Sequence, residues 1–427
     1  MNKKILAGMT TAAIAASLVC ACPVSAEEKA VTLKFYHNWT QEDQPQFFID
    51  LADEFMEAHP NVTIEITNVG DPDYTNKLNI QMGTDDAPDV FYTWSGEYIN
   101  KFIRSGQILD LTSYLDEAPE WRDSFVPAAI DIFDYTKTEE KDTYAIPYRV
   151  DGKVMVYNKD IFEEYGLTAP ATWDEFLAVC QTLKDNDVIP VALGATEGWT
   201  SCHYITTFNA QYVSKDVRLS DYQYDSGDFS DPGYVDALNK YTELADLGYF
   251  TPNAYAVDFY AARNDFFVGK AAMTYMQAEE FHNFSDYDLN VGCFILPAAE
   301  DCAGIANVMT GAPDGFCVSA GCKNPEIAVE WLKYITSAEN EARMVDVFDT
   351  PAAVQGVMND SNSTELMLQF VDLYENADDF ANWLDSEINS EVANVYVPGI
   401  QEVLGGTMTA EELMEEVHEI AVEISEG

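Results

Sequence analysis

Carboxylates are the most numerous side chains in this sequence that could do chemistry. The chain has 427 residues, of which 74 are Asp or Glu, 22 are Lys or Arg and five are His. Two carboxylates about 5–10 Å apart can hydrolyse a glycosidic bond. A sequence with so many acidic residues does not exclude such a catalytic pair. The sequence contains no nucleophile elbow, HExxH motif, phosphate-binding glycine-rich loop or EF-hand loop. The residues alone therefore indicate no particular reaction.

Histidine and cysteine are not spaced as metal ligands. No C-x-x-C pair occurs, and the histidines are scattered along the chain at His37, His59, His203, His282 and His418. We therefore expect no metal and no other cofactor. Two cysteine pairs are close enough in sequence to form disulfides in an exported protein, with free thiols as the alternative: Cys293 with Cys302, and Cys317 with Cys322.

The elements that would position functional side chains are clearest between residues 144 and 176. The apolar runs 144–148 and 154–157 predict two short strands, which Asp151 and Gly152 interrupt. A turn at 158–160, a short helix and a second helix follow. Asp151 thus stands at the end of a strand, where a carboxylate either contacts a ligand or caps the next turn.

Three helix starts carry recognisable signals. Thr172 is followed three residues later by Glu175, and Thr409 by Glu412, which is the spacing of a capping box. Asn324-Pro325 begins a further helix, whose apolar residues Ala328, Trp331, Leu332 and Ile335 lie on one face. Trp331 is therefore predicted to be a core residue.

Strand and helix patterns alternate along the chain, which predicts an α/β fold. Residues 31–35 and 62–66 alternate in hydrophobicity as half-buried strands do, and 88–92 is an apolar run typical of a buried strand. Helical patterns at 48–55 and 74–82 separate them. This β-α-β-α-β order implies a parallel sheet covered by helices, and a second series runs from 146 to about 297. The length implies more than one hydrophobic core.

The N-terminus predicts export. Lys3 and Lys4 precede the apolar run 5–19, which is shorter than the roughly 20 residues of a membrane span and is typical of a secretory signal. Two cleavage sites compete. Cleavage after Ala26 would leave a mature chain from Glu27, whereas an imperfect lipobox would make Cys22 a lipid-modified N-terminus that anchors the protein to a membrane.

The formal net charge of −52 restricts the partners. Such a surface repels nucleic acid and anionic lipid, so we expect no nucleic-acid partner and no membrane contact beyond a lipid anchor. The apolar fraction of 47% is ample for a folded core, so the acidity indicates a well-solvated surface.

Several motifs in a fixed order resemble one protein family. They are IPY at 146–148, YNK at 157–159, TWDEF at 172–176, PDVF at 88–91 before Trp94, GKAAM at 269–273, and APDGF at 312–316 before KNPEIA at 323–328. These motifs resemble those of the extracellular solute-binding proteins of ABC importers, in the maltose-binding-protein-like branch that mostly carries sugars and oligosaccharides. The resemblance covers nearly all of the chain after the signal.

The resemblance implies a two-lobed periplasmic-binding-protein-like fold. Each lobe would be built from discontinuous chain, joined by short hinge segments, and would close on a ligand held in the cleft. With residues 1–26 as signal peptide, the first lobe would comprise 27–143 and about 298–343. The second lobe would comprise 144–297 and about 344–427.

The resemblance also implies where the ligand binds. Aromatic rings would cover the C–H faces of a sugar, while carboxylates and amides would bind its hydroxyl groups. The matching positions in this chain, together with Thr310 in the return loop, are Asn38, Trp39, Trp94, Asp151, Trp199, Glu279, Gly311, Asp314 and Trp383.

Some of these positions have a structural alternative. Glu279 stands where the family usually has Trp, which removes one stacking platform and offers a hydroxyl acceptor instead. Trp39 and Trp94 end strands, where an aromatic residue is often a lid on the core. Trp199 is open between loop packing and ligand contact, whereas Trp173 is expected to pack.

The implied function is delivery of a sugar to the permease subunits of an ABC importer, outside the cytoplasm, by a monomer that is not an enzyme. The main alternative is a binding protein for a polyamine or another non-sugar solute, which acidic residues such as Asp151 and Glu279 would suit. A secreted glycosidase is less favoured, and an adhesion protein would be expected to show repeats.

Overall fold

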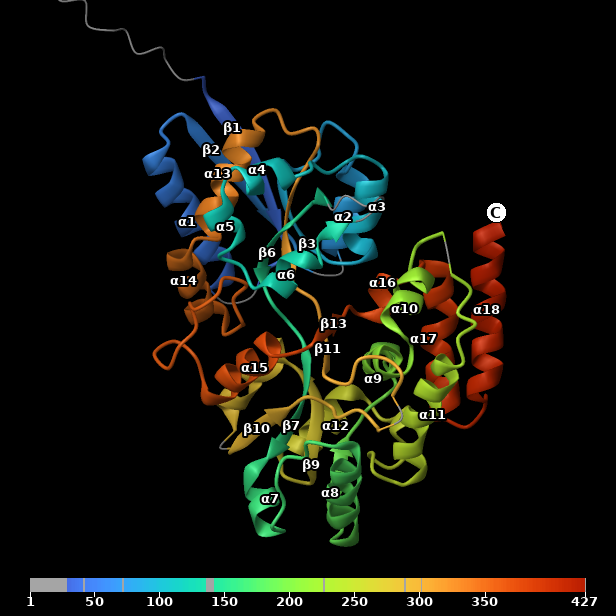
Figure 1. Cartoon of the computed structure of the whole chain (residues 1–427). Coiled ribbons are helices and arrows are strands. Elements are labelled where there is room, and N and C mark those ends of the chain that lie inside the picture. The colour runs from blue at the N-terminus through green and yellow to red at the C-terminus, as the bar shows by residue number, and fades with distance from the viewer. Residues whose placement is uncertain are drawn as a thin grey trace, which may run out of the picture.

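The computed structural model describes residues 29–426, apart from 41–42, 71–72, 136–141, 226, 288 and 301. The predicted signal sequence and Cys22 therefore lie outside the described residues. Two sheets, each with its own helices, form two lobes, and the C-terminal helices lie on the outside of the second (Figure 1). Two large hydrophobic cores are present, so the prediction of more than one core is confirmed. One fills the first lobe and extends into the second through residues such as Val154 and Val156, and the other lies within the second lobe.

The first sheet contains the three strands predicted near the N-terminus. β1 (Val31–His37) pairs in parallel with β2 (Val62–Asn68) and with β3 (Val90–Trp94). β12 (Asp314–Val318) then pairs antiparallel with β3 and with β6 (Ile146–Arg149). The order is β2-β1-β3-β12-β6, so the predicted parallel sheet is completed by two strands from later in the chain.

Helices from both ends of the sequence belong to the first lobe. α1 (Gln44–Ala58) contacts α13 (Pro325–Ile335) and α14 (Ala338–Phe348), and Trp331 is fully buried, as predicted. The other helices between β2 and β6 are α2 (Asp73–Gln81), α3 (Glu97–Arg104), α4 (Thr112–Asp116), α5 (Pro119–Arg122) and α6 (Pro127–Asp131).

The second sheet is mostly antiparallel. β7 (Lys153–Asn158) pairs antiparallel with β9 (Ala271–Gln277), β10 (Val291–Phe294) and β11 (Val308–Thr310). Parallel pairing occurs between β8 (Ile189–Ala192) and β9, and between β11 and β13 (Asp379–Ala381). The parallel arrangement expected from strand and helix alternation therefore holds here only at the two edges.

Besides α13 and α14, ten α-helices follow β7 in the described part of the chain. They are α7 (Lys159–Glu164), α8 (Trp173–Asp185), α9 (Gly198–Tyr212), α10 (Lys215–Asp221), α11 (Gly233–Asp246), α12 (Phe259–Phe267), α15 (Glu365–Glu375), α16 (Leu384–Glu387), α17 (Ser390–Leu404) and α18 (Ala410–Glu426). None of the described helices is long and apolar enough to cross a membrane.

The observed helix starts match the predicted ones to different degrees. The Thr409–Glu412 capping box has both of its hydrogen bonds. At α8 the Glu175 amide donates to Thr172, but the Glu175 carboxylate accepts from the Ala171 amide, one residue before the expected position. Asn158 caps α7 directly, so the turn predicted at 158–160 is the start of the helix.

Three segments cross between the two sheets. Residues 150–152 run from β6 to β7, residues 311–313 run from β11 back to β12, and residues 349–364 run from α14 to α15. The first two touch, because a Cβ on Gly311 would lie only 2.3 Å from the Asp151 carbonyl oxygen. We keep the division into two lobes as a proposal, with its boundaries at these crossings in place of 144, 298 and 344.

All six cysteines from Cys180 onward are free in the structure, so neither possible disulfide is formed.

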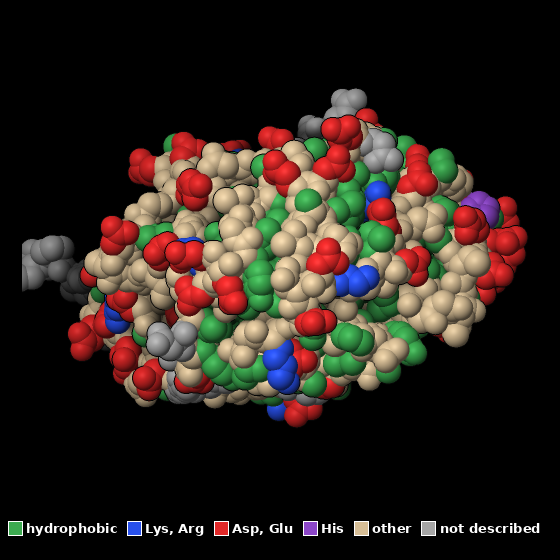
Figure 2. Space-filling model, turned by 90° about the horizontal axis from the view of Figure 1, so that it is seen from below, with side chains coloured by type: hydrophobic (Ala, Val, Ile, Leu, Met, Phe, Trp, Pro, Cys, Tyr) green, Lys and Arg blue, Asp and Glu red, His purple; other side chains and the backbone are tan. Residues whose placement is uncertain are grey.

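Figure 2 shows acidic side chains scattered over the face seen from below, among few basic ones. The negative charge is therefore spread over this face instead of forming a single patch.

Candidate functional site

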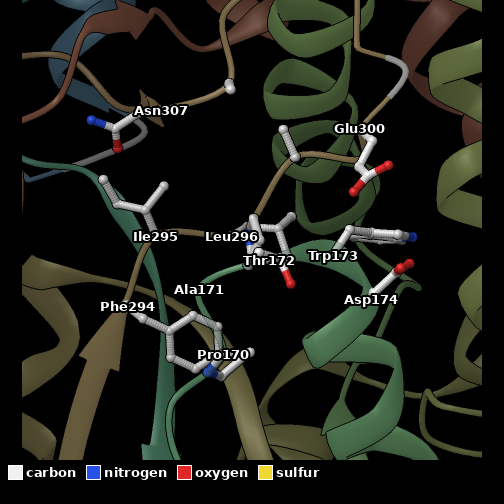
Figure 3. Close-up of a pocket in the computed structure, with 13 residues that line it drawn as sticks. Pro170, Ala171, Thr172, Trp173, Asp174, Phe294, Ile295, Leu296, Glu300 and Asn307 are labelled. Atoms are coloured by element: carbon white, nitrogen blue, oxygen red, sulfur yellow. The ribbon is translucent and has the colours of Figure 1, made fainter.

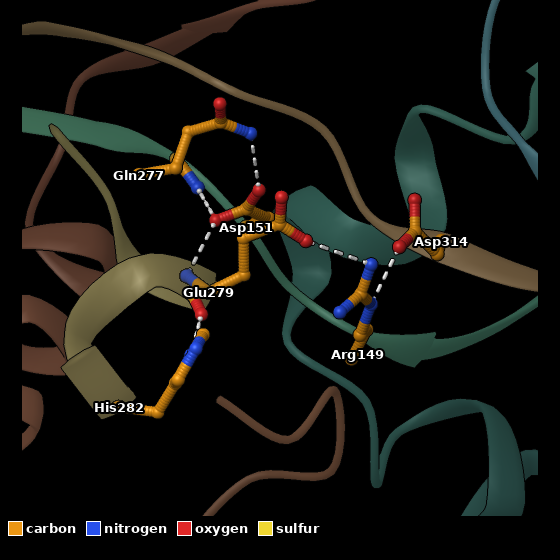
Figure 4. A network of polar contacts seen from close by, with 7 residues as sticks. Arg149, Asp151, Gln277, Glu279, His282 and Asp314 are labelled. Atoms are coloured by element: carbon orange, nitrogen blue, oxygen red, sulfur yellow. Dashed lines mark hydrogen bonds and ion pairs between the residues drawn. The ribbon is translucent and has the colours of Figure 1, made fainter. Parts of the chain in front are cut away.

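Charged and amide side chains meet where the first two crossing segments touch (Figure 4). The Arg149 guanidinium donates through Nε to Asp314 at 2.5 Å and through Nη2 to Glu279 at 3.2 Å. The Asp151 carboxylate accepts from the Gln277 side chain at 2.9 Å and from the Glu279 amide at 3.3 Å. We call these five residues the crossing network.

Strand ends bring the crossing network together. Arg149 is the last residue of β6, and Asp314, the first of β12, is its partner in the strand register. Gln277 ends β9 opposite Lys153, the first residue of β7. Asp151 lies in the segment between β6 and β7, and Glu279 lies in the first turn of the 3-10 helix that follows β9 (Ala278–Asp286). Both sheets therefore contribute to one polar site.

Burial sets the electrostatics of the crossing network. Burial, and then the charge of Glu279, raise the pKa of Asp151 to about 8. Burial also raises the pKa of Asp314, although Arg149 opposes that shift. Burial acts to lower the pKa of Arg149, but the surrounding carboxylates outweigh it and keep the pKa well above the usual value. The guanidinium is therefore a fixed cation among three acids.

A second group of predicted residues lies in the second lobe around Trp199. Its ring centroid is 5.3 Å from His203 and 4.7 Å from Phe259, and the Lys153 ammonium lies 4.9 Å from it. Trp383 also packs against His203, and the centroids of these two rings are 4.3 Å apart. Both tryptophans are half-buried, so part of each ring is open to a ligand.

Trp94 lies on the first-lobe side. It is half-buried, and its ring is 5.0 Å from Tyr92 and 5.1 Å from Tyr98. The next residue, Ser95, hydrogen-bonds across the lobes to Asn382 at 3.0 Å, and the same Asn382 oxygen accepts the Trp383 amide. The two aromatic groups are thus connected through one amide side chain.

Trp39 has the environment of a core residue. It is 6% exposed and its ring is surrounded by six other aromatic rings, whereas the neighbouring Asn38 is half-buried. Gly311 and Thr310 are buried beside the crossing, where Gly311 allows the two segments to touch. The structure therefore encloses Trp39 in the first-lobe core, where Tyr92 lies between it and Trp94, and the core alternative describes its surroundings.

Three residues of this region were missed by the sequence reasoning: Arg149, Gln277 and Lys153. Arg149 and Lys153 stand at strand ends beside Asp151, in a chain that has only 22 basic residues. A cation that interrupts an apolar run in so acidic a chain was a signal that could have found them. Gln277 carried no such signal.

A separate hollow of about 410 Å³ lies at the start of α8 (Figure 3). Its lining includes Trp173, Asp174, Phe294, Leu296 and Glu300, and none of the predicted site residues. Trp173 is buried, as predicted. This hollow lies within the second lobe and receives no residue of the crossing network.

Two α/β lobes, joined by crossing segments that carry a polar site, define a two-lobed binding protein. The family described as "Bacterial extracellular solute-binding protein" matches residues 38–342. That match spans more than half of the sequence, and the chain belongs to this family. It is therefore a solute-binding component that works outside the cytoplasm.

Relatives and solved structures agree with this assignment. The multiple sugar-binding protein of Streptococcus mutans is 27% identical over 398 residues, covering 90% of this chain and 89% of the relative. The melibiose/raffinose/stachyose-binding protein of Bacillus subtilis is 21% identical, covering 89% and 85%. A chitin oligosaccharide binding protein has a similar fold, with a TM-score of 0.76 and 21% identity over 93% of this chain and 100% of that one.

Proposed function

We propose that this protein binds a sugar or oligosaccharide between its lobes and delivers it to the permease of an ABC importer. The observation that carries the proposal is the crossing network, with half-buried tryptophans on both sides of it. Carboxylates accept hydrogen bonds from sugar hydroxyl groups, a guanidinium donates them, and the rings cover apolar faces. The named relatives above bind sugars, which supports the same chemistry here.

The proposed contacts divide into two kinds. The polar contacts are Asp151, Glu279 and Asp314, with Arg149 added from the structure. The stacking contacts are Trp94, Trp199 and Trp383, with Asn38 at the edge. We assign Gly311 and Thr310 to the hinge, and Trp39 to support of the first lobe.

A polyamine is the second candidate ligand. The crossing network holds three carboxylates against one guanidinium, which is a formal charge of about −2 if all three are ionised. A polycation would neutralise this excess directly. A neutral sugar, in contrast, would be bound with Asp151 protonated, as its raised pKa allows.

We also propose how the protein is held and presented. Export would follow the N-terminal signal, with either cleavage after Ala26 or lipid attachment at Cys22. The protein would act as a monomer that closes on its ligand, a population shift that exposes a surface made by both lobes to the permease.

Thermal unfolding of the chain from Glu27 tests the proposal. A panel of mono- and oligosaccharides, with polyamines included, should give a raised melting temperature for one saccharide series, because a ligand of the native state stabilises it by mass action. A response to polyamines alone would favour the second candidate. A protein freed of retained ligand that responds to neither would contradict both.

Glu279→Gln separates the two ligands further. The amide still accepts a hydroxyl hydrogen bond, so sugar affinity should fall about tenfold or less, whereas a polycation should lose more because a charge is removed. Glu120→Gln, at an exposed position in α5, removes the same charge away from the site and should leave both affinities unchanged.

A further inference from the structure

A small internal cavity lies in the second lobe, next to Trp199 and behind the crossing network. It has a volume of about 20 Å³, and its polar lining comes from β7, β9, α9 and α12: Lys153, Thr200, Tyr204, Arg263, Thr274 and Tyr275. One water-sized species needs about 10–15 Å³ by this kind of measure. The cavity therefore has room for one small molecule or ion.

Lys153 places a cation at this cavity. The residue is 3% exposed, and its one hydrogen bond within the described part of the chain is to the Tyr275 carbonyl at 3.4 Å. No carboxylate of the described residues lies within ion-pair distance of its ammonium. Burial lowers the pKa of Lys153, while Glu280, Asp151 and Glu279 act to raise it and Arg263 to lower it. A buried ammonium in this position is stabilised by a counter-charge in contact with it.

Two further donors line the cavity without partners. Arg263 pairs through Nη1 with Glu280 at 2.6 Å, but its Nε is buried and has no hydrogen-bond partner. The Tyr204 hydroxyl is buried and unpartnered as well. With Lys153, the lining therefore offers an ammonium, a guanidinium N–H and a hydroxyl, all of which can donate.

We propose that this cavity binds a small monatomic anion, such as chloride, between Lys153 and Arg263. An anion accepts from all three donors at once, which a water molecule with two donors of its own does less well. Of the two cations, only Arg263 forms an ion pair with a carboxylate of the described residues, which leaves the Lys153 ammonium to contact the anion. The site is separate from the proposed sugar or polyamine contacts, although Lys153 also lies 4.9 Å from the Trp199 ring.

Halide dependence of thermal unfolding tests the site. The mature protein is unfolded in sodium chloride, sodium bromide and sodium methanesulfonate at equal ionic strength. Chloride and bromide should raise the melting temperature by roughly 2 °C over methanesulfonate, because only an ion small enough for the cavity stabilises the native state. Equal melting temperatures in the three salts would overturn the proposal.

Matched variants locate the effect. Lys153→Met should lose the halide response, whereas Lys270→Met, which removes an exposed lysine paired with Asp265, should keep it. If Lys153→Met does not fold, Tyr204→Phe removes one donor with little change of shape and should weaken the response. A response that persists unchanged in Tyr204→Phe or Lys153→Met would place the anion elsewhere and overturn the assignment.

Crystals grown in bromide give a direct answer. Anomalous scattering should show a peak beside the Lys153 ammonium in the wild-type protein, a weaker peak in Tyr204→Phe and none in Lys153→Met at the same bromide concentration. A cavity without a bromide peak in the wild-type crystal would mean that it holds water, which contradicts the proposal.

Discussion

Each lobe places a tryptophan beside a buried histidine, but the two surroundings differ. In the first lobe the Trp39 ring has six neighbours with centroids between 4.4 and 5.8 Å away: His37, Phe48, Tyr92, Tyr148, Phe316 and Phe348. In the second lobe Trp199 and Trp383 flank His203 and stay half-buried. We call these the Trp39 cluster and the Trp199 cluster.

The difference separates stability from binding. Burial lowers the pKa of His37 to about 3 and that of His203 well below its usual value, so both imidazoles are neutral near pH 7 and neither serves as a cation. What distinguishes the clusters is the exposed ring surface. A ring enclosed by other rings stabilises the lobe, whereas a half-exposed ring beside a charged network is available to a ligand.

Replacing Trp39 or Trp199 by alanine should give the largest difference in stability between the two clusters. Trp39→Ala should lower the free energy of unfolding by about 3–5 kcal/mol, because it leaves a large cavity in a packed aromatic core. Trp199→Ala should lower it by about 1–2 kcal/mol, since that ring is only partly buried. Urea unfolding measures both values.

Binding should show the reverse order. Trp199→Ala should weaken ligand affinity by tenfold or more, while Trp39→Ala, measured where it is still folded, should keep most of it. Equal losses of stability in the two variants, or a larger affinity loss in Trp39→Ala, would remove the distinction between the clusters.

Arg149 belongs to neither cluster but to the crossing network, and its removal should affect stability and binding together. Arg149→Met leaves Asp314 buried without its cation, so we expect a loss of about 3 kcal/mol in the free energy of unfolding. Arg122→Met, which removes a more exposed ion pair with Asp116, should cost at most about 1 kcal/mol. Chemical unfolding of both variants, with titration of the ligand, checks this. Similar losses in the two would mean that the crossing network contributes no more than a surface pair.

The pH dependence of stability should single out Asp151. Its pKa is about 8 in the native protein, so it keeps a proton that the unfolded chain loses above about pH 4. The unfolded state then binds fewer protons, and stability falls as pH rises from about 5 to 8 and levels off above 8. The slope for one such group is at most about 1.4 kcal/mol per pH unit.

Asp151→Asn should remove that part of the slope, so its stability relative to the wild type should increase with pH. Asp131→Asn, at an exposed position in α6, serves as the control and should leave the slope unchanged. Identical slopes for the wild type and Asp151→Asn between pH 5 and 8 would show that Asp151 is ionised throughout.

The clusters also show which parts of the fold could be predicted from sequence. The strands and helices between residues 31 and 94 were predicted correctly, because the alternation of apolar residues is a local signal. The return of residues 312–316 to the first lobe was implied only by the family resemblance. The alternation did not predict that β12 and β6 complete that sheet, since Arg149 and Asp314 are paired across 165 positions. The antiparallel second sheet was missed for the same reason.

The ligand contacts stay a prediction, but the structure shows which of the predicted residues lie together. The structure brings Asp151, Glu279 and Asp314 together, and Trp199 with Trp383, but it encloses Trp39 in the core. Sequence places an aromatic residue at a strand end without giving its exposed fraction, which depends on rings contributed by distant segments such as Phe316 and Phe348. Arg149 was missed because its partners come from β12 and from the turn after β9.

Gly311 allows the smallest and most specific perturbation, since it touches neither cluster. Its backbone lies against Asp151 and Gly152, where a Cβ would come within 2.3 Å of a carbonyl oxygen that belongs to the other crossing segment. Gly311→Ala must therefore push the two segments apart, at a cost of about 1–2 kcal/mol in the free energy of unfolding. Gly321→Ala, where a Cβ meets nothing within 4 Å, is the matched control and should be neutral.

If the crossings act as a hinge, Gly311→Ala should also weaken ligand binding although every proposed contact is intact, because lobe closure depends on how the segments lie. Loss of stability with unchanged affinity would mean that the Trp94 side and the Trp199 cluster bind without help from the crossing.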